Sequence, residues 1–158
     1  MGVDEKFMLL AIEAAKHGML KGQTPFGVAI AKGGKLLCAA HNAVWKEKDT
    51  TAHGEVKAVR MACRKLGTID LSGCTIYSTC EPCPMCFSAI HWAKIRRIVY
   101  GAGIDDAKKA GFRELEISNA KMKRMGRSRI SLKGGVLRGE CKALFSLFSR
   151  FGGKKKLY

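Results

Sequence analysis

The chain has 158 residues, of which 47% are apolar, so it is long enough for a substantial core, and a mostly disordered protein is excluded. The net charge is +16, and no run approaches the roughly 18 apolar residues that a membrane-spanning helix needs. Because the amino terminus is charged and lacks the apolar core of a signal peptide, we expect a cytoplasmic protein that does not contact a membrane.

The first half of the chain alternates helical and strand patterns. Apolar residues from Phe7 to Ala15 recur at three- and four-residue steps, which predicts a helix that ends near Gly18. We then expect two strands, over 26–31 and 35–40, joined by a turn at Gly33-Gly34. A helix over 52–66 and a third strand over 74–79 follow. The segment Asp49-Thr50-Thr51 offers capping side chains for the helix over 52–66.

The second half continues the alternation. We expect a helix over 83–94, a strand over 98–100, a helical stretch broken at Gly111, a helix over 114–125, a strand over 129–132 and a helix over 136–151. Strands that alternate with helices predict an α/β fold with a layered, partly parallel sheet. No repeat or linker interrupts the pattern, so residues 1–158 are expected to form a single domain with a basic C-terminal helix and tail from about residue 118.

Two short motifs carry groups that bind a metal. His53-Gly54-Glu55 supplies an imidazole and a carboxylate, and Pro82-Cys83-Pro84-Met85-Cys86 supplies two thiols. Catalytic zinc sites use three nitrogen or sulfur ligands from the protein and leave the fourth position for water. We therefore expect His53, Cys83 and Cys86 to bind zinc, with both motifs in the first turns of helices.

Glu55 follows the expected histidine ligand by two residues, which favours a proton-transfer role over a fourth metal contact. It would take a proton from the water that zinc activates and pass it to a ring nitrogen and then to a departing amine. The pattern H-x-E with P-C-x-x-C is the signature of zinc-dependent base deaminases, so the predicted reaction is hydrolytic deamination.

Cys80 leaves two other metal sites open. It could complete a closed structural zinc site as a fourth ligand, although such a site gives Glu55 no role. Its even spacing with Cys83 and Cys86 also resembles an iron–sulfur ligand run, but that run normally ends in a fourth cysteine followed by proline, which is absent here.

Positive charge is concentrated near the carboxyl terminus. From Ser118 to the end there are twelve Lys or Arg residues and one acidic residue, Glu140. The densest patch contains Lys121, Lys123, Arg124, Arg127 and Arg129, and it could bind phosphate groups. It lacks interleaved aromatic residues, and a solvated surface is the simpler interpretation.

Several further segments give the chain a resemblance to a known family. These are Pro25-Phe26-Gly27, His41-Asn42, Thr51-Ala52-His53-Gly54-Glu55 and Cys80-Glu81-Pro82-Cys83-Pro84-Met85-Cys86. The chain resembles the cytidine deaminase superfamily, in the branch that contains guanine deaminases and tRNA adenosine deaminases. The resemblance implies a three-layer sandwich with a central five-stranded mixed sheet flanked by helices, one zinc ion per chain and a homodimer.

Within that branch the chain is more similar to guanine deaminases. The similarity rests on Ser78-Thr79-Cys80-Glu81, on Trp92, on Ala110-Gly111-Phe112 and on the ending Lys155-Lys156-Leu157-Tyr158. It implies that the C-terminal tail exchanges between subunits, so that Tyr158 covers the partner's pocket.

The resemblance also implies residue roles. Asn42 would bind the purine, Phe26 would pack on its ring, and Trp92 would line the pocket, where Gly54 replaces the usual alanine. From the residues alone, ordinary core packing of Phe26 and Trp92, or a turn made by Asn42, remains open.

One departure from the guanine deaminases affects the expected substrate. They usually have an aspartate after the Gly-Phe pair, whereas this chain has Arg113-Glu114, so we take Glu114 as the substrate contact. We expect a deaminase of a small purine, with guanine to xanthine and ammonia as the leading hypothesis. The alternatives are a tRNA adenosine-to-inosine deaminase and a non-catalytic, zinc-stabilised RNA-binding module.

Overall fold

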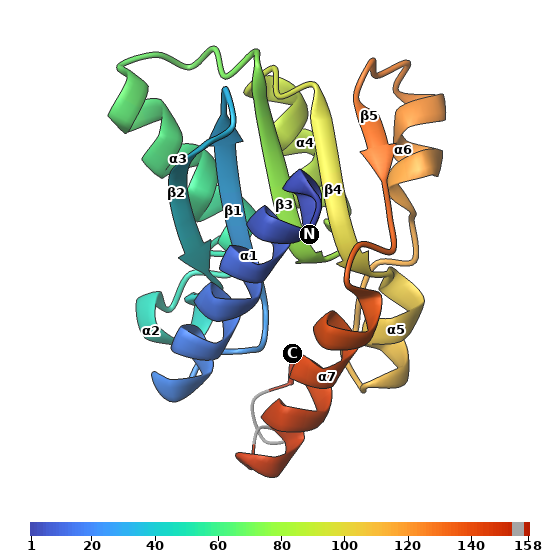
Figure 1. Ribbon diagram of the computed structural model, residues 1–158. Coiled ribbons are helices and arrows are strands. Elements are labelled where there is room, and N and C mark those ends of the chain that lie inside the picture. Colours follow the sequence, from blue (N-terminus) through green and yellow to red (C-terminus); the bar gives the residue numbers. More distant parts are fainter. Residues whose placement is uncertain (153–156) are drawn as a thin grey trace.

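Five strands form one mixed sheet in the order β2-β1-β3-β4-β5 in the computed structural model, which describes residues 1–152 and 157–158 (Figure 1). The strands are β1 (Gly27–Lys32), β2 (Lys35–His41), β3 (Cys74–Cys80), β4 (Arg97–Ala102) and β5 (Ser131–Lys133). β1 pairs antiparallel with both β2 and β3, whereas β3, β4 and β5 run parallel. The expected five-stranded mixed sheet is confirmed.

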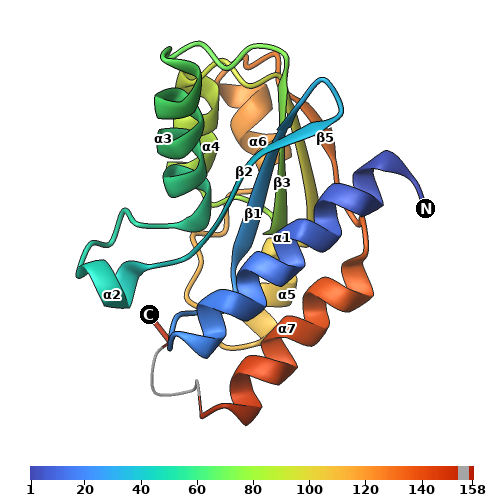
Figure 2. The same cartoon turned by 60° about the vertical axis from the view of Figure 1, so that its left-hand side comes forward.

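Helices cover both faces of this sheet (Figure 2). One face is covered by α3 (Gly54–Leu66), α4 (Pro84–Trp92) and α6 (Asn119–Met125), and the other by α1 (Val3–Leu20) and α7 (Arg138–Arg150). Two shorter helices are α2 (Val44–Glu47), which follows β2, and α5 (Ile104–Lys109), which follows β4. The result is a three-layer sandwich, as the sequence predicts.

Each strand residue faces the layer that the two-residue period of a strand assigns to it. Val28 and Ile30 of β1 belong to the core under α3 and α4, whereas Ala29 and Ala31 pack toward α1 and α7. Ile76 and Tyr77 of β3 divide in the same way. Because both faces are buried, the sheet is a rigid support for the loops at its ends.

The parallel pairing of β3 and β4 positions the motif residues. The chain leaves β3 at Cys80, and α4 begins at Pro84 after its N-cap Cys83, because proline suits the first position of a helix and not the interior of a strand. Polar side chains in such folds gather outside the carboxyl ends of the parallel strands, where the helices that follow begin.

Several boundaries differ from the sequence-based expectation. α3 begins at Gly54, and Asp49 accepts hydrogen bonds from Thr51 in a preceding turn and does not cap the helix. α6 begins only at Asn119, with Ser118 as its N-cap, so residues 114–118 are not helical. Helix α2 was not expected from the sequence. Among the residues that the structure describes, no helix is long and apolar enough to cross a membrane.

Candidate active site

The three expected metal ligands lie at two helix starts. His53 is the N-cap of α3, Cys83 is the N-cap of α4, and Cys86 is the third residue of α4. Their ligand atoms all lie within 4.8 Å of one another, and no other such group of three occurs in the part of the chain that the structure describes. The two motifs, 30 residues apart in sequence, therefore meet at one point.

The spacing of these atoms fits zinc. His53 Nδ1 lies 3.7 Å from Cys83 Sγ and 3.5 Å from Cys86 Sγ. Tetrahedral bonds of about 2.3 Å to sulfur and about 2.0 Å to nitrogen would place these ligand atoms about 3.6 Å apart. One imidazole and two thiols in this arrangement can hold a zinc ion with little movement.

The thiols are electrostatically unequal in the metal-free protein. A hydrogen bond from Cys86 lowers the pKa of Cys83 to about 4, with a smaller contribution from His53. The same hydrogen bond to Cys83, together with burial, raises the pKa of Cys86 well above its ordinary value. A thiolate is the form that binds metal, so both thiols must be deprotonated when zinc is bound.

Glu55 lies beside the ligands and is buried. Its Oε1 accepts a hydrogen bond from Ser78 Oγ at 3.0 Å, and its Oε2 lies 3.5 Å from Cys86 Sγ. Burial is the largest cause that raises the pKa of the Glu55 carboxyl above its ordinary value. A carboxyl group with a raised pKa next to a metal site is suited to take up a proton and return it.

A small pocket opens over these residues. The ligand His53, the acid Glu55 and four predicted contact residues line it, namely Phe26, Asn42, Glu114 and Tyr158, together with Cys80, Glu81, Cys83 and Phe112. The cavity volume is only about 30 Å³, enough for about two water molecules. The structure therefore brings chemistry and recognition residues together, in a closed arrangement.

Asn42 and Tyr158 close this pocket. Asn42 is 1% exposed; its Oδ1 accepts the Val44 N–H at 3.1 Å, and its Nδ2 donates to Tyr158 Oη at 2.6 Å. Asn42 thus forms the turn that the sequence left open, and it also presents its amide N–H to the pocket. In this single chain the Tyr158 ring lies 6.3 Å from the ring of His53. Lys155 and Lys156 of the tail lie outside the described residues.

Glu114 reaches the pocket from a segment without regular structure. Burial raises the pKa of its carboxyl to about 7, and the nearby Cys83 and Glu55 add to the shift. Such a group can be either donor or acceptor near neutral pH.

Two predicted contact residues, Gly54 and Trp92, do not line this pocket. Gly54, the first residue of α3, is buried, and an added Cβ would lie 3.0 Å from Val28 Cγ2. Trp92 is 79% exposed and does not line this pocket, because it ends α4 while Cys83 precedes the start of the same helix, about 13 Å away. A single chain does not bring Trp92 to the metal ligands.

Three pocket-lining residues, Cys80, Glu81 and Phe112, and one neighbour of the pocket, Ser78, were not predicted as catalytic or substrate-binding residues. Ser78 binds Glu55, Phe112 stacks edge-on against Phe26 at 4.8 Å between ring centroids, and Cys80 and Glu81 line the pocket wall. Only Glu81 had a usable sequence signal, as a carboxylate next to the ligand motif. Cys80 is not part of the metal cluster, and its Sγ lies 3.7 Å from Gly103 O, so the described residues do not form a four-ligand site.

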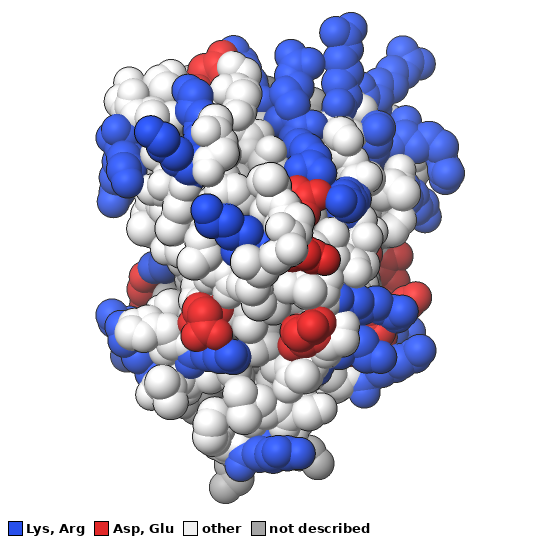
Figure 3. Space-filling view, viewed as in Figure 1, with Lys and Arg blue, Asp and Glu red and all other residues white. Residues whose placement is uncertain are grey.

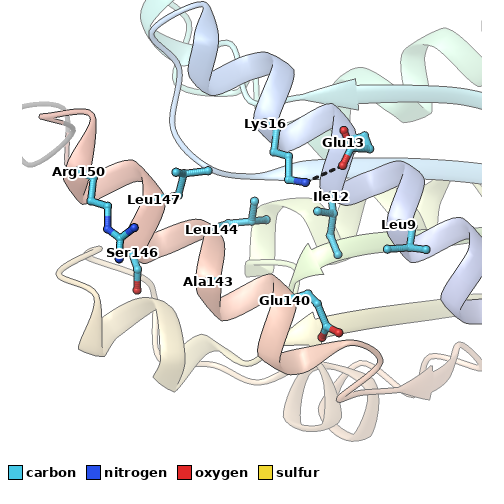
Figure 4. Close-up of a pocket in the computed structure, with 10 residues that line it drawn as sticks. All are labelled: Leu9, Ile12, Glu13, Lys16, Glu140, Ala143, Leu144, Ser146, Leu147 and Arg150. Carbon is cyan, nitrogen blue, oxygen red and sulfur yellow. Dashed lines mark hydrogen bonds and ion pairs between the residues drawn. The ribbon is translucent and has the colours of Figure 1, made fainter.

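A larger groove lies away from these residues and has no histidine or cysteine among the described residues of its lining. Figure 4 shows a groove of about 450 Å³ between α1 and α7, floored by Leu9, Ile12, Leu144 and Leu147. Its acidic residue Glu13 is paired with Lys16 at 2.7 Å. An apolar groove without metal-binding side chains is not a candidate for hydrolytic chemistry.

The basic C-terminal patch is on the surface. Lys and Arg side chains gather over α6 and β5, at the upper right of Figure 3. Lys121, Arg124, Arg127 and Arg129 are exposed there, and Lys123 is half-buried. The positive charge is therefore available to solvent and to anions.

Comparisons with known proteins identify the family of this chain. Residues 1–102 match the family described as the cytidine and deoxycytidylate deaminase zinc-binding region, and the chain belongs to this family. It is therefore a hydrolytic deaminase that acts on C–N bonds, from a zinc-binding family.

Its relatives have two different substrates. Guanine deaminase of Bacillus subtilis (strain 168) is 43% identical over 109 residues, 68% of this chain and 70% of that protein. The tRNA-specific adenosine deaminase of the same organism is 34% identical over 156 residues, 99% of this chain and 94% of that protein. A solved structure of guanine deaminase from Nitrosomonas europaea has a TM-score of 0.85 at 29% identity, covering 92% of this chain and 84% of that one.

Proposed function

We propose that the protein deaminates a free purine base, most directly guanine to xanthine and ammonia, with one zinc ion per chain. The observation that carries the proposal is the pocket itself: the ligands, Glu55 and the polar groups of Asn42 and Glu114 face one enclosed space beside the ring of Phe26. An enclosed apolar wall with a few polar groups suits a flat heterocycle.

The chain's residues have distinct roles in this reaction. His53, Cys83 and Cys86 would hold a zinc ion, which when bound would activate a water. Glu55, oriented by Ser78, would carry one proton of that water to a ring nitrogen and the other to the departing amine, which leaves as ammonia while the water oxygen stays on the carbon. Because Glu55 is buried, the proton stays within the site while the C–N bond breaks.

Purine recognition is assigned to three side chains. Phe26 offers its ring face, the Asn42 amide donates to an acceptor on the base, and Glu114 meets an N–H of the base. A cavity of about 30 Å³ is too small for a purine, so Tyr158 moves away from Asn42 when the base enters. The Tyr158 ring then covers the bound base.

We further propose that two chains form a homodimer. In the single chain Tyr158 lies over the pocket of its own chain, and exchange of the C-terminal tails would place it over the partner's pocket instead. The length of chain between α7 and Tyr158 supports such an exchange: helix α7 ends at Arg150, and the tyrosine follows eight residues later. Trp92, exposed at the end of α4, is then free to reach a pocket formed with the second chain.

A second candidate function is deamination of adenosine in tRNA. The exposed cations over α6 and β5 favour it, because an enzyme on tRNA must bind a phosphate backbone. The pocket favours the free base, since Tyr158 closes it over a small volume.

A substrate panel separates these functions. The zinc-loaded protein is incubated with guanine, isoguanine, cytosine, adenine, guanosine and tRNA, and ammonia release is followed at constant salt. We expect guanine to have the highest kcat/KM. Activity on tRNA alone would show the second function, and no ammonia from any substrate would leave a non-catalytic, zinc-stabilised module.

A further inference from the structure

One carboxylate next to the metal ligands joins two segments that are distant in sequence. Glu81 lies two residues before Cys83. Its Oε1 accepts the backbone N–H of Asn119 at 2.8 Å, and its Oε2 accepts the N–H of Ile104 at 3.3 Å. These are the first residues of α6 and α5, so one carboxylate binds both helix starts.

A second contact strengthens this connection. Asn119 is 0% exposed, and its Nδ2 donates to the carbonyl oxygen of Pro82 at 2.6 Å. Asn119 is therefore bound through its backbone and its side chain to two consecutive residues of the ligand motif. A buried contact of this kind is costly to break, because each freed polar group would lose its partner.

The segment held in this way is the one that carries Glu114. Residues 112–118 form neither helix nor strand, so little within the segment fixes its path. Its amino-terminal end packs through Phe112 against Phe26, and its carboxyl-terminal end is fixed by the contacts of Asn119. Since Pro82 precedes Cys83, the distance from the segment to the metal ligands is set by Glu81 and Asn119.

Glu81 has no direct role in metal binding or proton transfer that the contacts support. It is not part of the metal-binding group, and both of its oxygens accept backbone N–H groups. Each oxygen of the carboxylate already binds the N–H of a helix start, so these contacts give Glu81 a structural role.

We propose that Glu81 is a positioning residue that places Glu114 against the bound base, so that the affinity for substrate depends on Glu81 although it does not touch the base. This proposal rests on the proposed function, because Glu114 is there the purine contact. It makes Glu114, which the segment 112–118 carries, the pocket group that selects the substrate.

Glu81→Gln tests this directly. The neutral amide can accept only one of the two N–H groups and turns its own NH₂ toward the other. We expect KM for guanine to rise about tenfold, as loss of a charge-assisted hydrogen bond implies, with kcat changed less than about threefold. Zinc content stays unchanged. The matched control is Glu116→Gln, an exposed carboxylate of the same segment that pairs with Lys108, and it should leave KM unchanged.

A double-mutant cycle with Glu114→Gln distinguishes positioning from general damage. If Glu81 acts through Glu114, Glu81→Gln adds little to KM once Glu114 is replaced. The proposal would be overturned if the two substitutions raised KM independently, so that their fold-changes multiply in the double variant. A fall in kcat at constant KM, or loss of zinc in Glu81→Gln, would also overturn it. If Glu81→Gln does not fold, Glu81→Asp, which keeps the charge on a shorter side chain, should raise KM in the same way.

Amide hydrogen exchange gives a readout that needs no substrate. Exchange in residues 112–118 should become faster in Glu81→Gln, while the strands keep their protection. Unchanged exchange there would refute the anchoring. If the wild-type protein releases no ammonia from guanine, the proposed function fails, and the exchange experiment still decides whether Glu81 holds the segment.

Discussion

Residues 1–102 and residues 103–158 contribute to the same pocket in different ways. In the first region the site groups stand at the ends of regular elements: His53 and Cys83 cap helices, and Ser78 lies in a buried strand. In the second region Glu114 lies in an irregular segment, and Tyr158 ends the chain. Residues 1–102 therefore hold the reaction groups, and also Phe26 and Asn42, next to regular elements, whereas the positions of Glu114 and Tyr158 depend on a few contacts.

The difference teaches where substrate choice can change. The family match covers residues 1–102, and relatives with that region act on guanine or on tRNA. Bond breaking requires the reacting groups to be positioned to within less than about 1 Å, and regular elements hold side chains with that precision. An irregular segment can vary without disturbing the core, which lets one reaction serve several bases.

The largest expected effect tests the first region. Glu55→Gln keeps the shape and the Ser78 contact but cannot take a proton, so kcat for guanine should fall about 10³-fold. Zinc content, measured by atomic absorption, should stay at the wild-type level because Glu55 is not a ligand. Glu140→Gln, an exposed carboxylate, is the control. Loss of zinc together with activity would contradict the assignment of Glu55.

An intermediate effect tests how the second region is held. Asp106 accepts two hydrogen bonds from Arg138 at 2.9 Å, and these lower the pKa of its carboxyl to about 2. Because the folded pKa lies below the ordinary value, the contact stabilises the fold above about pH 4 and is lost as the pH falls toward 2. Asp106→Asn should lose about 2 kcal/mol of unfolding free energy at pH 7.

Urea unfolding between pH 7 and pH 2 checks this prediction. The difference in unfolding free energy between wild type and Asp106→Asn should shrink as the pH falls through the folded pKa. Asp105→Asn, at the exposed neighbouring position, should behave as wild type. A difference that is independent of pH would mean that the charge of Asp106 contributes nothing.

The smallest effect concerns the cover of the pocket. Tyr158→Phe keeps the ring but removes the hydroxyl that occupies Asn42, so an incoming base no longer has to displace it. Loss of one such hydrogen bond predicts a KM for guanine about threefold lower. Steady-state kinetics would show it, and a higher KM would mean that the hydroxyl binds the base and does not compete with it. Removal of Leu157 and Tyr158 together should raise KM, since the cover is lost.

The sequence predicted the reaction groups better than their surroundings. The spacing of His53, Glu55, Cys83 and Cys86 indicated a metal site at helix starts, and the structure places the three ligand atoms within 4.8 Å. The helix expected over 114–125 was too long, because Glu81 and Ser118 bind the N–H groups that start α6 at Asn119. Such distant contacts have no signature in local periodicity.

Trp92 shows the same limit from another side. The resemblance to guanine deaminases made it a pocket candidate, yet α4 carries it to the end of the helix away from Cys83, where it is 79% exposed. Glu81 is the opposite case, a residue whose role the sequence did not predict. Its hydrogen bonds reach Ile104 and Asn119, which are 23 and 38 residues further along the chain.

The sequence by itself predicted the metal ligands and the proton carrier and determined the layered fold, because residue type, short spacing and apolar period are local properties. Only the tertiary structure decided which groups surround the base. Asn42 and Tyr158 are 116 residues apart, and Glu114 is brought in by contacts of Glu81 and Asn119. Those juxtapositions arise from packing across the whole chain, which no local pattern encodes.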